Sequence, residues 1–312
     1  MNRAAPHPDV ARVVAQFAAA GVPTYDTVGV LHARALLEGV TRVQGPKVEL
    51  ARVRDVLLPG AVGRLPARVY HPDPTRPLPV VLYLHGGGWT LGGIKPADGP
   101  CRALAAASGC VVVSLAYRLA PETPFPGPLE DCVAAARALA ADPAAVGGDD
   151  GAVVLVGDSA GGNLAAATSL VLRGTAVVRA QVLLYPCLSP ARNSPFASYA
   201  ENADGPLMTR AELLWFWDHY LGPDGDPTDP RAAPLAAPDH SGLPPTTVVV
   251  CELDPLRDEG LEYARVLDAA EVEVRAVTIP GAAHGFWWMD AVMSQAGELT
   301  AQLGTWIRGY TA

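Results

Sequence analysis

Residues 153–163 read Val-Val-Leu-Val-Gly-Asp-Ser-Ala-Gly-Gly-Asn, and this stretch decides the fold. A continuous apolar run ends at Gly157 and an alanine-rich helical segment begins at about Ala160, so Ser159 lies in a turn between a buried strand and a helix. Glycines on both sides of the serine permit a strained backbone, because side chains there would collide. In this context G-x-S-x-G is typical of a nucleophilic serine; the alternative is a plain glycine-rich turn.

Outward from this turn, short apolar runs alternate with helical segments. Most runs are apolar throughout, like strands covered on both faces, and the last alternates like a strand near an edge. This predicts an α/β fold with a mainly parallel central sheet flanked by helices. A Pro-Gly-Ala turn predicts that the first two strands form an antiparallel edge pair. The expected strands are Val53–Leu58, Gly63–Tyr70, Pro79–Leu84, Cys110–Ala116, Ala152–Val156, Ala180–Leu184, Thr246–Cys251 and Val272–Thr278. The expected helices are Ala97–Ala107, Pro128–Ala141, Gly161–Leu172, Asp258–Ala269 and Asp290–Ile307.

Two regions stand outside this alternation. Residues 1–50 show helical apolar spacing before any strand, and residues 188–245 are rich in Pro, Gly and Asp but contain one aromatic helix. Ligands of open α/β folds bind at the carboxyl ends of the strands, so we expect both regions to form a helical cap over that edge. The catalytic core would then comprise residues 51–187 and 246–312.

Composition excludes several classes of protein. Of the 312 residues, 50% are hydrophobic and 18% charged, as in a folded globular chain. The net charge of -9 argues against a nucleic-acid partner, because phosphate binding needs clustered Lys and Arg. The sequence predicts neither a transmembrane helix nor a signal peptide. The five cysteines lack C-x-x-C spacing and are interpreted as buried free thiols, so we expect a cytoplasmic protein.

A second glycine-rich segment, His-Gly-Gly-Gly-Trp at 85–89, directly follows an expected strand. Successive glycines let backbone amides approach a ligand, as an oxyanion hole for acyl transfer requires. We assign Gly86 and Gly87 as amide donors, together with Ala160. A phosphate-binding loop is the rival interpretation, but neither Gly-Lys-Ser/Thr nor G-x-G-x-x-G spacing occurs here.

Of the seven histidines, only His284 follows the last expected strand. A loop at the carboxyl edge of the sheet can deliver its imidazole to Ser159 from the same side. The chain order serine, acid, histidine also favours His284 as general base. His85 is the alternative base, although its position beside the glycines favours a structural role.

The carboxylate that orients the base should follow the preceding strand. Four acids compete there, and Asp254 is preferred because it lies just beyond the strand end. Asp258 and Glu259 fall at the start of the next helix, where acids act as caps, and Glu252 is the weakest candidate.

Six motifs in a fixed order span roughly residues 80–290. Together they resemble the hormone-sensitive-lipase-like carboxylesterases, the bacterial family IV branch of the α/β-hydrolases. The motifs are HGGGW at 85–89, YRLAPE at 117–122, FPGPLEDC at 125–132, GDSAGGN at 157–163, DPLRDEG at 254–260 and HGF at 284–286.

The resemblance implies an α/β-hydrolase fold and a serine carboxylesterase acting on small-molecule esters with short to medium acyl chains. It implies a triad of Ser159, Asp254 and His284, oxyanion donors at Gly86, Gly87 and Ala160, and no metal or other cofactor. A homodimer through an edge strand is an expectation from the resemblance alone.

Three aromatic residues are candidates for a substrate pocket, because apolar side chains dominate such sites. They are Trp89 and Phe286, beside the motifs, and Trp215 in the aromatic helix. Asp158, next to the serine, is interpreted as a loop-stabilising acid.

Two rival functions use the same scaffold. One is a small-ligand binding protein that has lost its base, which the presence of His284 disfavours. The other is an amidase or peptidase, on which the triad is silent because pocket shape and leaving-group protonation decide it.

Overall fold

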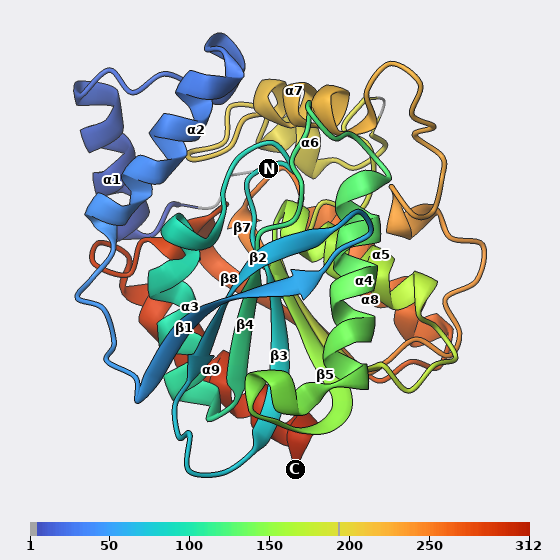
Figure 1. The fold of residues 1–312 in the computed structure, drawn as a ribbon. Helices are drawn as coiled ribbons and strands as arrows, with labels where there is room; N and C mark the ends of the chain where they lie inside the picture. Colours follow the sequence, from blue (N-terminus) through green and yellow to red (C-terminus); the bar gives the residue numbers. More distant parts are fainter. Residues whose placement is uncertain (1–4, 193) are drawn as a thin grey trace.

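The computed structural model describes residues 5–192 and 194–312, and within them it shows an eight-stranded sheet between layers of helices (Figure 1). The strands are β1 (Arg52–Pro59), β2 (Arg64–His71), β3 (Leu78–Leu84), β4 (Val111–Leu115), β5 (Gly148–Asp158), β6 (Val178–Leu184), β7 (Thr246–Leu253) and β8 (Val274–Ala283). The helices are α1 (Pro8–Ala19), α2 (Val30–Glu38), α3 (Ile94–Ser108), α4 (Gly127–Ala141), α5 (Ala160–Val171), α6 (Ser198–Glu201), α7 (Arg210–Leu221), α8 (Arg257–Ala269) and α9 (Ser294–Thr311).

The sheet order is β1-β2-β4-β3-β5-β6-β7-β8. β1 and β2 form the expected antiparallel edge pair, β2 also runs antiparallel to β4, and every later pair is parallel. The mainly parallel α/β fold is thus confirmed. The strand order reverses between β3 and β5, where Leu84 pairs with Gly157. The glycine-rich loop after β3 and the serine turn after β5 therefore lie side by side at the switch point, where such folds bind ligands.

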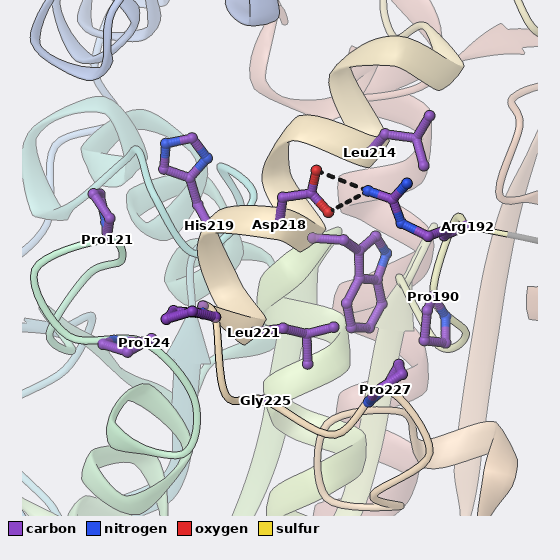
Figure 2. Close-up of a pocket in the computed structure, with 13 residues that line it drawn as sticks. Pro121, Pro124, Pro190, Arg192, Leu214, Asp218, His219, Leu221, Gly225 and Pro227 are labelled. Atoms are coloured by element: carbon purple, nitrogen blue, oxygen red, sulfur yellow. Dashed lines mark hydrogen bonds and ion pairs between the residues drawn. The ribbon is translucent and has the colours of Figure 1, made fainter.

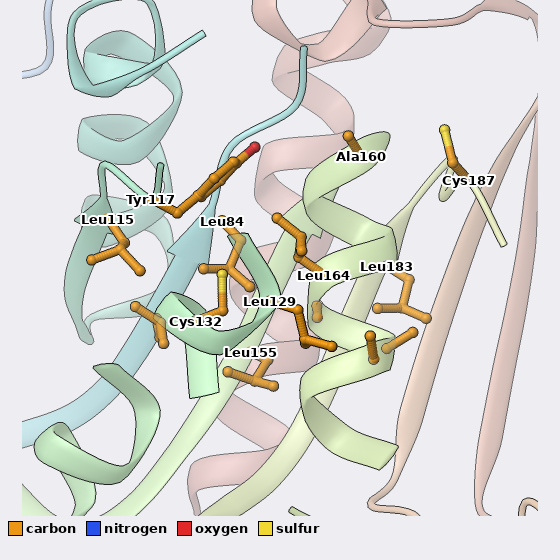
Figure 3. Close-up of a cluster of buried hydrophobic side chains, with 14 of the residues drawn as sticks. Leu84, Leu115, Tyr117, Leu129, Cys132, Leu155, Ala160, Leu164, Leu183 and Cys187 are labelled. Atoms are coloured by element: carbon orange, nitrogen blue, oxygen red, sulfur yellow. The ribbon is translucent and has the colours of Figure 1, made fainter. Parts of the chain in front are cut away.

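Alternate residues of the inner strands enter two separate hydrophobic cores. Val80, Leu82 and Leu84 of β3 face the core under α4, α5 and α8, part of which Figure 3 shows. Val81 and Tyr83 face the core under α3 and α9. Because helices cover both faces, the inner strands are apolar at most positions, although β4 carries Ser114 and β6 carries Gln181. Each fully buried aliphatic side chain contributes about 1.5–3 kcal/mol.

The last strand is longer than expected. The sequence predicts a strand over Val272–Thr278, but β8 continues to Ala283, which pairs with Leu253 of β7. The amide of Gly281 donates to the Glu252 carboxylate at 2.7 Å. This partner from another strand fixes the backbone at Gly281, which has a φ of 64° beside a shift in the β7–β8 register, and no local pattern reveals it.

The last helix starts later than expected. Asp290 precedes α9, which begins at Ser294. The Asp290 carboxylate accepts the amide of Gly45 at 2.9 Å, and the amide of Ser294 donates to Asp9 at 3.0 Å. Both contacts come from the N-terminal region, which therefore sets the boundary of the C-terminal helix.

Helices α1, α2, α6 and α7 lie together beyond the carboxyl end of the sheet (Figure 1). The two sequence regions that supply them are in contact, because the amide of Tyr25 donates to Glu212 of α7 at 3.0 Å. Arg34 of α2 donates to the carbonyl of Thr90 at 2.9 Å and forms a two-pronged ion pair with Glu122 of the core. These contacts support a division into a cap (1–50 and 188–245) and a core (51–187 and 246–312), which we retain as a proposal.

All five cysteines are free and buried, as expected. Burial raises the pKa of the Cys101, Cys132 and Cys251 thiols, which keeps them protonated and unreactive. In the part of the chain that the structure describes, every helix is too short or too polar to cross a bilayer.

Asp98 of α3 joins three parts of the fold. Its buried carboxylate lies 2.6 Å from Lys47 Nζ and 3.0 Å from both Arg68 Nη1 and Arg102 Nε, and it accepts the hydroxyl of Tyr70 at 3.0 Å. Burial alone would raise the pKa of Asp98, but these donors lower it to about 2. The carboxylate is therefore charged at neutral pH and stabilises the packing of the N-terminal region, β2 and α3.

Asp98→Asn should lower the free energy of unfolding by about 2 kcal/mol at pH 7, less than the ~3–5 kcal/mol of a fully buried pair, because the cations keep contact with water. The folded-state pKa of about 2 lies below the ordinary 3.8, so this stabilisation is present above about pH 4 and is lost as pH falls toward 2. Urea denaturation should show the difference between wild type and variant fall by about half at pH 3. A pH-independent difference would contradict this interpretation.

Candidate active site

Ser159 occupies the turn between β5 and α5 with a positive φ of 55° and a ψ of -121°. Such a conformation costs about 1–3 kcal/mol and persists only where the surrounding structure enforces it. A Cβ atom on Gly157 would lie 2.1 Å from the carbonyl oxygen of Gly161, and one on Gly161 would lie 1.9 Å from that of Leu84. Both positions therefore require glycine, and the turn projects Ser159 beyond the strand end.

The structure brings Ser159, His284 and Asp254 into one hydrogen-bonded chain. His284 Nε2 lies 2.8 Å from Ser159 Oγ, and His284 Nδ1 lies 2.7 Å from Asp254 Oδ2. The second carboxylate oxygen of Asp254 accepts the amide of Leu256 at 2.9 Å, which fixes its orientation. The three side chains are 6%, 5% and 0% exposed, so water screens their interactions weakly.

Three carboxylates act on the imidazole of His284. Burial alone would lower the pKa of His284, but the charges of Asp254, Asp158 and Glu212 outweigh it and raise the pKa above 6.5. Asp254 acts both through its charge and through its hydrogen bond. The site is therefore built to stabilise a protonated His284.

The other acids near Asp254 have different partners. Glu252 accepts the amide of Gly281 at 2.7 Å, and Asp258 accepts the amide of Ser198 at 2.8 Å. Glu259 accepts the amide of Leu188 at 2.6 Å and the hydroxyl of Tyr199 at 2.9 Å. Each of them thus holds a loop or helix start, which leaves Asp254 as the partner of the histidine.

The glycine-rich loop differs from the expectation at one residue. The amide of Gly86 donates to Asp158 Oδ1 at 2.9 Å, and this hydrogen bond argues against Gly86 as an oxyanion donor. The amides of Gly87 and Gly88 meet no acceptor among the described residues. Ala160 opens α5, so its amide has no acceptor within the helix. Gly87 and Ala160 stay predicted donors, and the free amide of Gly88 is a further candidate that sequence reasoning missed.

His85 fixes this loop from behind. Its Nδ1 lies 2.9 Å from the carbonyl oxygen of Gly86, and its ring stacks on Tyr117 with 4.3 Å between centroids. The Tyr117 hydroxyl donates to the His85 carbonyl at 2.6 Å. Burial lowers the pKa of His85 to about 4, which keeps the ring neutral. These contacts support the structural role that its position predicts.

The three candidate pocket residues have different surroundings. Trp89 is fully buried and stacks on Tyr220 of α7 at 4.1 Å, and Phe286 is fully buried with its ring 6.2 Å from that of Tyr185. Both side chains belong to the hydrophobic cores, and their pocket role stays a prediction. Trp215 is half-buried, and its pocket role stays a prediction.

Two further residues border the site without any signal in the local sequence. Cys187 Sγ lies 3.8 Å from Ser159 Oγ, although the sequence indicates only a buried thiol. Glu212, from the cap, is buried and contributes to the field at His284. Both reach the site through tertiary folding, because the loop after β6 lies against Ser159 and helix α7 packs against the glycine-rich loop at Gly88.

A cavity of about 670 Å³ lies apart from this chain of residues, between the end of α7 and the loops around it (Figure 2). Arg192 and Asp218 form an ion pair at its edge, with a nitrogen–oxygen distance of 2.8 Å. Prolines from several loops contribute to its wall, and Ser159, Asp254 and His284 do not line it. It is therefore separate from the candidate active site.

A buried Ser-His-Asp chain at the carboxyl edge of a mainly parallel sheet, beside a glycine-rich loop, defines the α/β-hydrolase class. A family model described as the alpha/beta hydrolase fold matches residues 81–288. Carboxylesterase NlhH of Mycobacterium tuberculosis is 40% identical over 245 residues, which are 76% of each chain. Ethyl acetate hydrolase of Pseudomonas putida is 37% identical over 240 residues, 75% of each chain.

Solved structures agree over nearly the whole chain. A hyperthermophilic esterase from Pyrobaculum calidifontis superposes with a TM-score of 0.92 and 36% identity, covering 98% of both chains. Ester-hydrolase EH1AB1 from the metagenome of Lake Arreo superposes with a TM-score of 0.93 and 34% identity, covering 98% of this chain and 99% of its own. The protein belongs to the hormone-sensitive-lipase-like, bacterial family IV branch of the α/β-hydrolases, a family of serine carboxylesterases.

Gly161→Ala should destabilise the fold by at least about 3 kcal/mol and abolish labelling of Ser159 by a fluorophosphonate, because the new Cβ would collide with the Leu84 carbonyl. Gly297→Ala is the matched control near the start of another helix, where a Cβ meets nothing within 4 Å. It should stabilise the protein by about 0.5–1 kcal/mol and leave labelling intact. Equal behaviour of the two variants in thermal unfolding and labelling would show that the serine turn is not sterically constrained.

Proposed function

We propose that this chain hydrolyses carboxylic esters with short to medium acyl chains through an acyl-enzyme on Ser159. The hydrogen-bonded chain from Ser159 through His284 to Asp254, with distances of 2.8 and 2.7 Å, carries the proposal. The names of the relatives support an ester as substrate, and ethyl acetate hydrolase supports a short one.

In the first step His284 Nε2 takes the proton of Ser159 as Oγ attacks the ester carbonyl carbon. The carbonyl π bond opens to an oxyanion while the Oγ–carbon bond forms. The Nδ1–H group of His284 donates a hydrogen bond to Asp254, and the carboxylate stabilises the resulting imidazolium. The raised pKa of His284 fits this role, because the imidazole must hold the proton until the leaving group takes it.

The oxyanion is bound by the amides of Gly87, Gly88 and Ala160. Ala160 begins α5, so the positive end of the helix dipole adds to its amide. Each such donor lowers the barrier by about 2.7–4 kcal/mol. The positive-φ turn at Ser159 places the nucleophile next to the amide of Ala160, so the serine attacks the carbonyl carbon where the oxyanion is stabilised.

Collapse of the tetrahedral intermediate breaks the bond to the alcohol oxygen, which takes the proton from His284 Nε2. Water then enters, and His284 removes its proton as it attacks the acyl carbon. The second intermediate releases the carboxylic acid, and the proton returns to Ser159. A binding protein without turnover has no need of this proton path, which favours catalysis over the binding alternative.

On p-nitrophenyl acetate, butyrate, octanoate and palmitate, wild type should be most active on the short and medium esters. Ser159→Ala and His284→Ala should lose about 10⁶-fold in kcat, and Asp254→Asn about 10⁴-fold. Initial rates with each ester, and circular dichroism to confirm folding, measure this.

A folded wild type that turns over p-nitroanilides but none of these esters would favour the amidase alternative. Activity that survives in His284→Ala would overturn the triad. Highest activity on palmitate would contradict the proposed chain length.

The pH profile provides an independent check of the base. His284 must be neutral to accept the proton, and its pKa is raised, so kcat/KM should rise with pH along a limb centred above 6.5. Hydrolysis of ethyl butyrate in a pH-stat between pH 5 and 9 measures this limb. A limb centred below pH 6 would contradict the electrostatics of the site.

A further inference from the structure

Asp158, the last residue of β5, is a buried carboxylate directly before the nucleophile. The proposed catalytic steps do not use it. It is 4% exposed, and its Oδ1 accepts the amide of Gly86 at 2.9 Å and the hydroxyl of Tyr83 at 2.5 Å. The indole nitrogen of Trp288 donates to the same hydroxyl at 3.1 Å. Both donors to Asp158 come from β3 and its end, so the carboxylate links the serine turn to the glycine-rich loop.

This link determines which amides of the loop are free. A Cβ on Gly86 would lie 2.4 Å from Asp158 Oδ2, so the contact requires glycine at position 86 as well. With the Gly86 amide held by the carboxylate, the chain turns at Gly87, with a φ of 118°, and Gly88, with a φ of 58°. Their amides remain without a protein acceptor among the described residues.

Asp158 directly precedes Ser159, whose Oγ lies 2.8 Å from His284 Nε2, so its buried charge also acts on the general base. The acidic groups that act on His284 are Asp254 of the β7 end, Asp158 of the β5 end and Glu212 of the cap. Burial raises the pKa of Asp158 to about 6, despite opposing contributions from Tyr83, Gly86 and His284. Above about pH 6 the Asp158 carboxylate is therefore mainly ionised.

We propose that Asp158 is a positioning residue that holds the oxyanion loop through the Gly86 amide and, as a second negative charge, stabilises the protonated form of His284. The inference rests on the proposed roles of Ser159 and His284. Replacing a residue that only anchored the fold would change the stability of the protein without changing the pKa of His284.

Two variants separate the hydrogen bond from the charge. Asp158→Asn keeps an oxygen that accepts the Gly86 amide, so kcat on p-nitrophenyl butyrate should fall less than about tenfold. Its acid limb of kcat/KM should nevertheless move to lower pH, because a negative charge beside His284 is gone. Asp158→Ala loses the acceptor too, and kcat should fall about 10²–10³-fold with KM changed less than about threefold.

Asp98→Asn is the matched control, because Asp98 is another buried carboxylate that accepts a tyrosine hydroxyl, and its partners do not include Ser159, Asp254 or His284. It should lower stability and leave the acid limb in place. An acid limb in Asp158→Asn that coincides with wild type would overturn the proposal, even if Asp158→Ala fails to fold. Equal kcat for Asp158→Ala and wild type would overturn it as well.

Ser159→Ala, assayed alongside, distinguishes a failure of the proposed function from a failure of the proposed role of Asp158. If it retains turnover, the proposed function fails and the role of Asp158 fails with it. If Ser159→Ala is inactive and the Asp158 variants match wild type in kcat and in the acid limb, only the role of Asp158 fails.

Discussion

The positive-φ backbone at Ser159 is the constraint on which the rest of the site depends. It exists because β5 must turn into α5 within one residue, and carbonyl oxygens crowd Gly157 and Gly161 on both sides. The parallel sheet supplies the rigid frame that enforces this turn, since β3 and β6 flank β5 in register. The same turn brings a serine hydroxyl, a helix N-terminus and the loop after β3 to one point.

Buried carboxylates around the serine turn determine how readily His284 binds a proton. Three carboxylates act on one imidazole in a region that water barely reaches, and they come from β5, from the loop after β7 and from the cap. In such surroundings the carboxylates outweigh the cost of burying the charged imidazole, so the pKa of His284 lies above its ordinary value. Helix α7 therefore contributes to the electrostatics of the site through Glu212, which also accepts the amide of Tyr25 from the N-terminal region.

The sheet was predictable because its signals are local. Strands covered on both faces are apolar at most positions, and glycine and proline mark the turns between elements. The extension of β8 to Ala283 and the start of α9 at Ser294 were not predictable, since Glu252, Gly45 and Asp9 set them from elsewhere in the chain. Local helix and strand propensities do not locate the end of an element where a hydrogen bond to a residue elsewhere in the chain sets it.

The sequence by itself determined the serine turn, the histidine after the last strand and the acid after the preceding one, because each lies at a strand end and strand ends meet at one edge. Only the tertiary structure decided which loop amides stay free. The partner of Gly86 is Asp158, 72 residues away, and this hydrogen bond forms only when β3 and β5 lie side by side. The burial of Trp89 and the approach of Cys187 to Ser159 likewise depend on the packing of α7 and of the loop after β6, which no local pattern encodes.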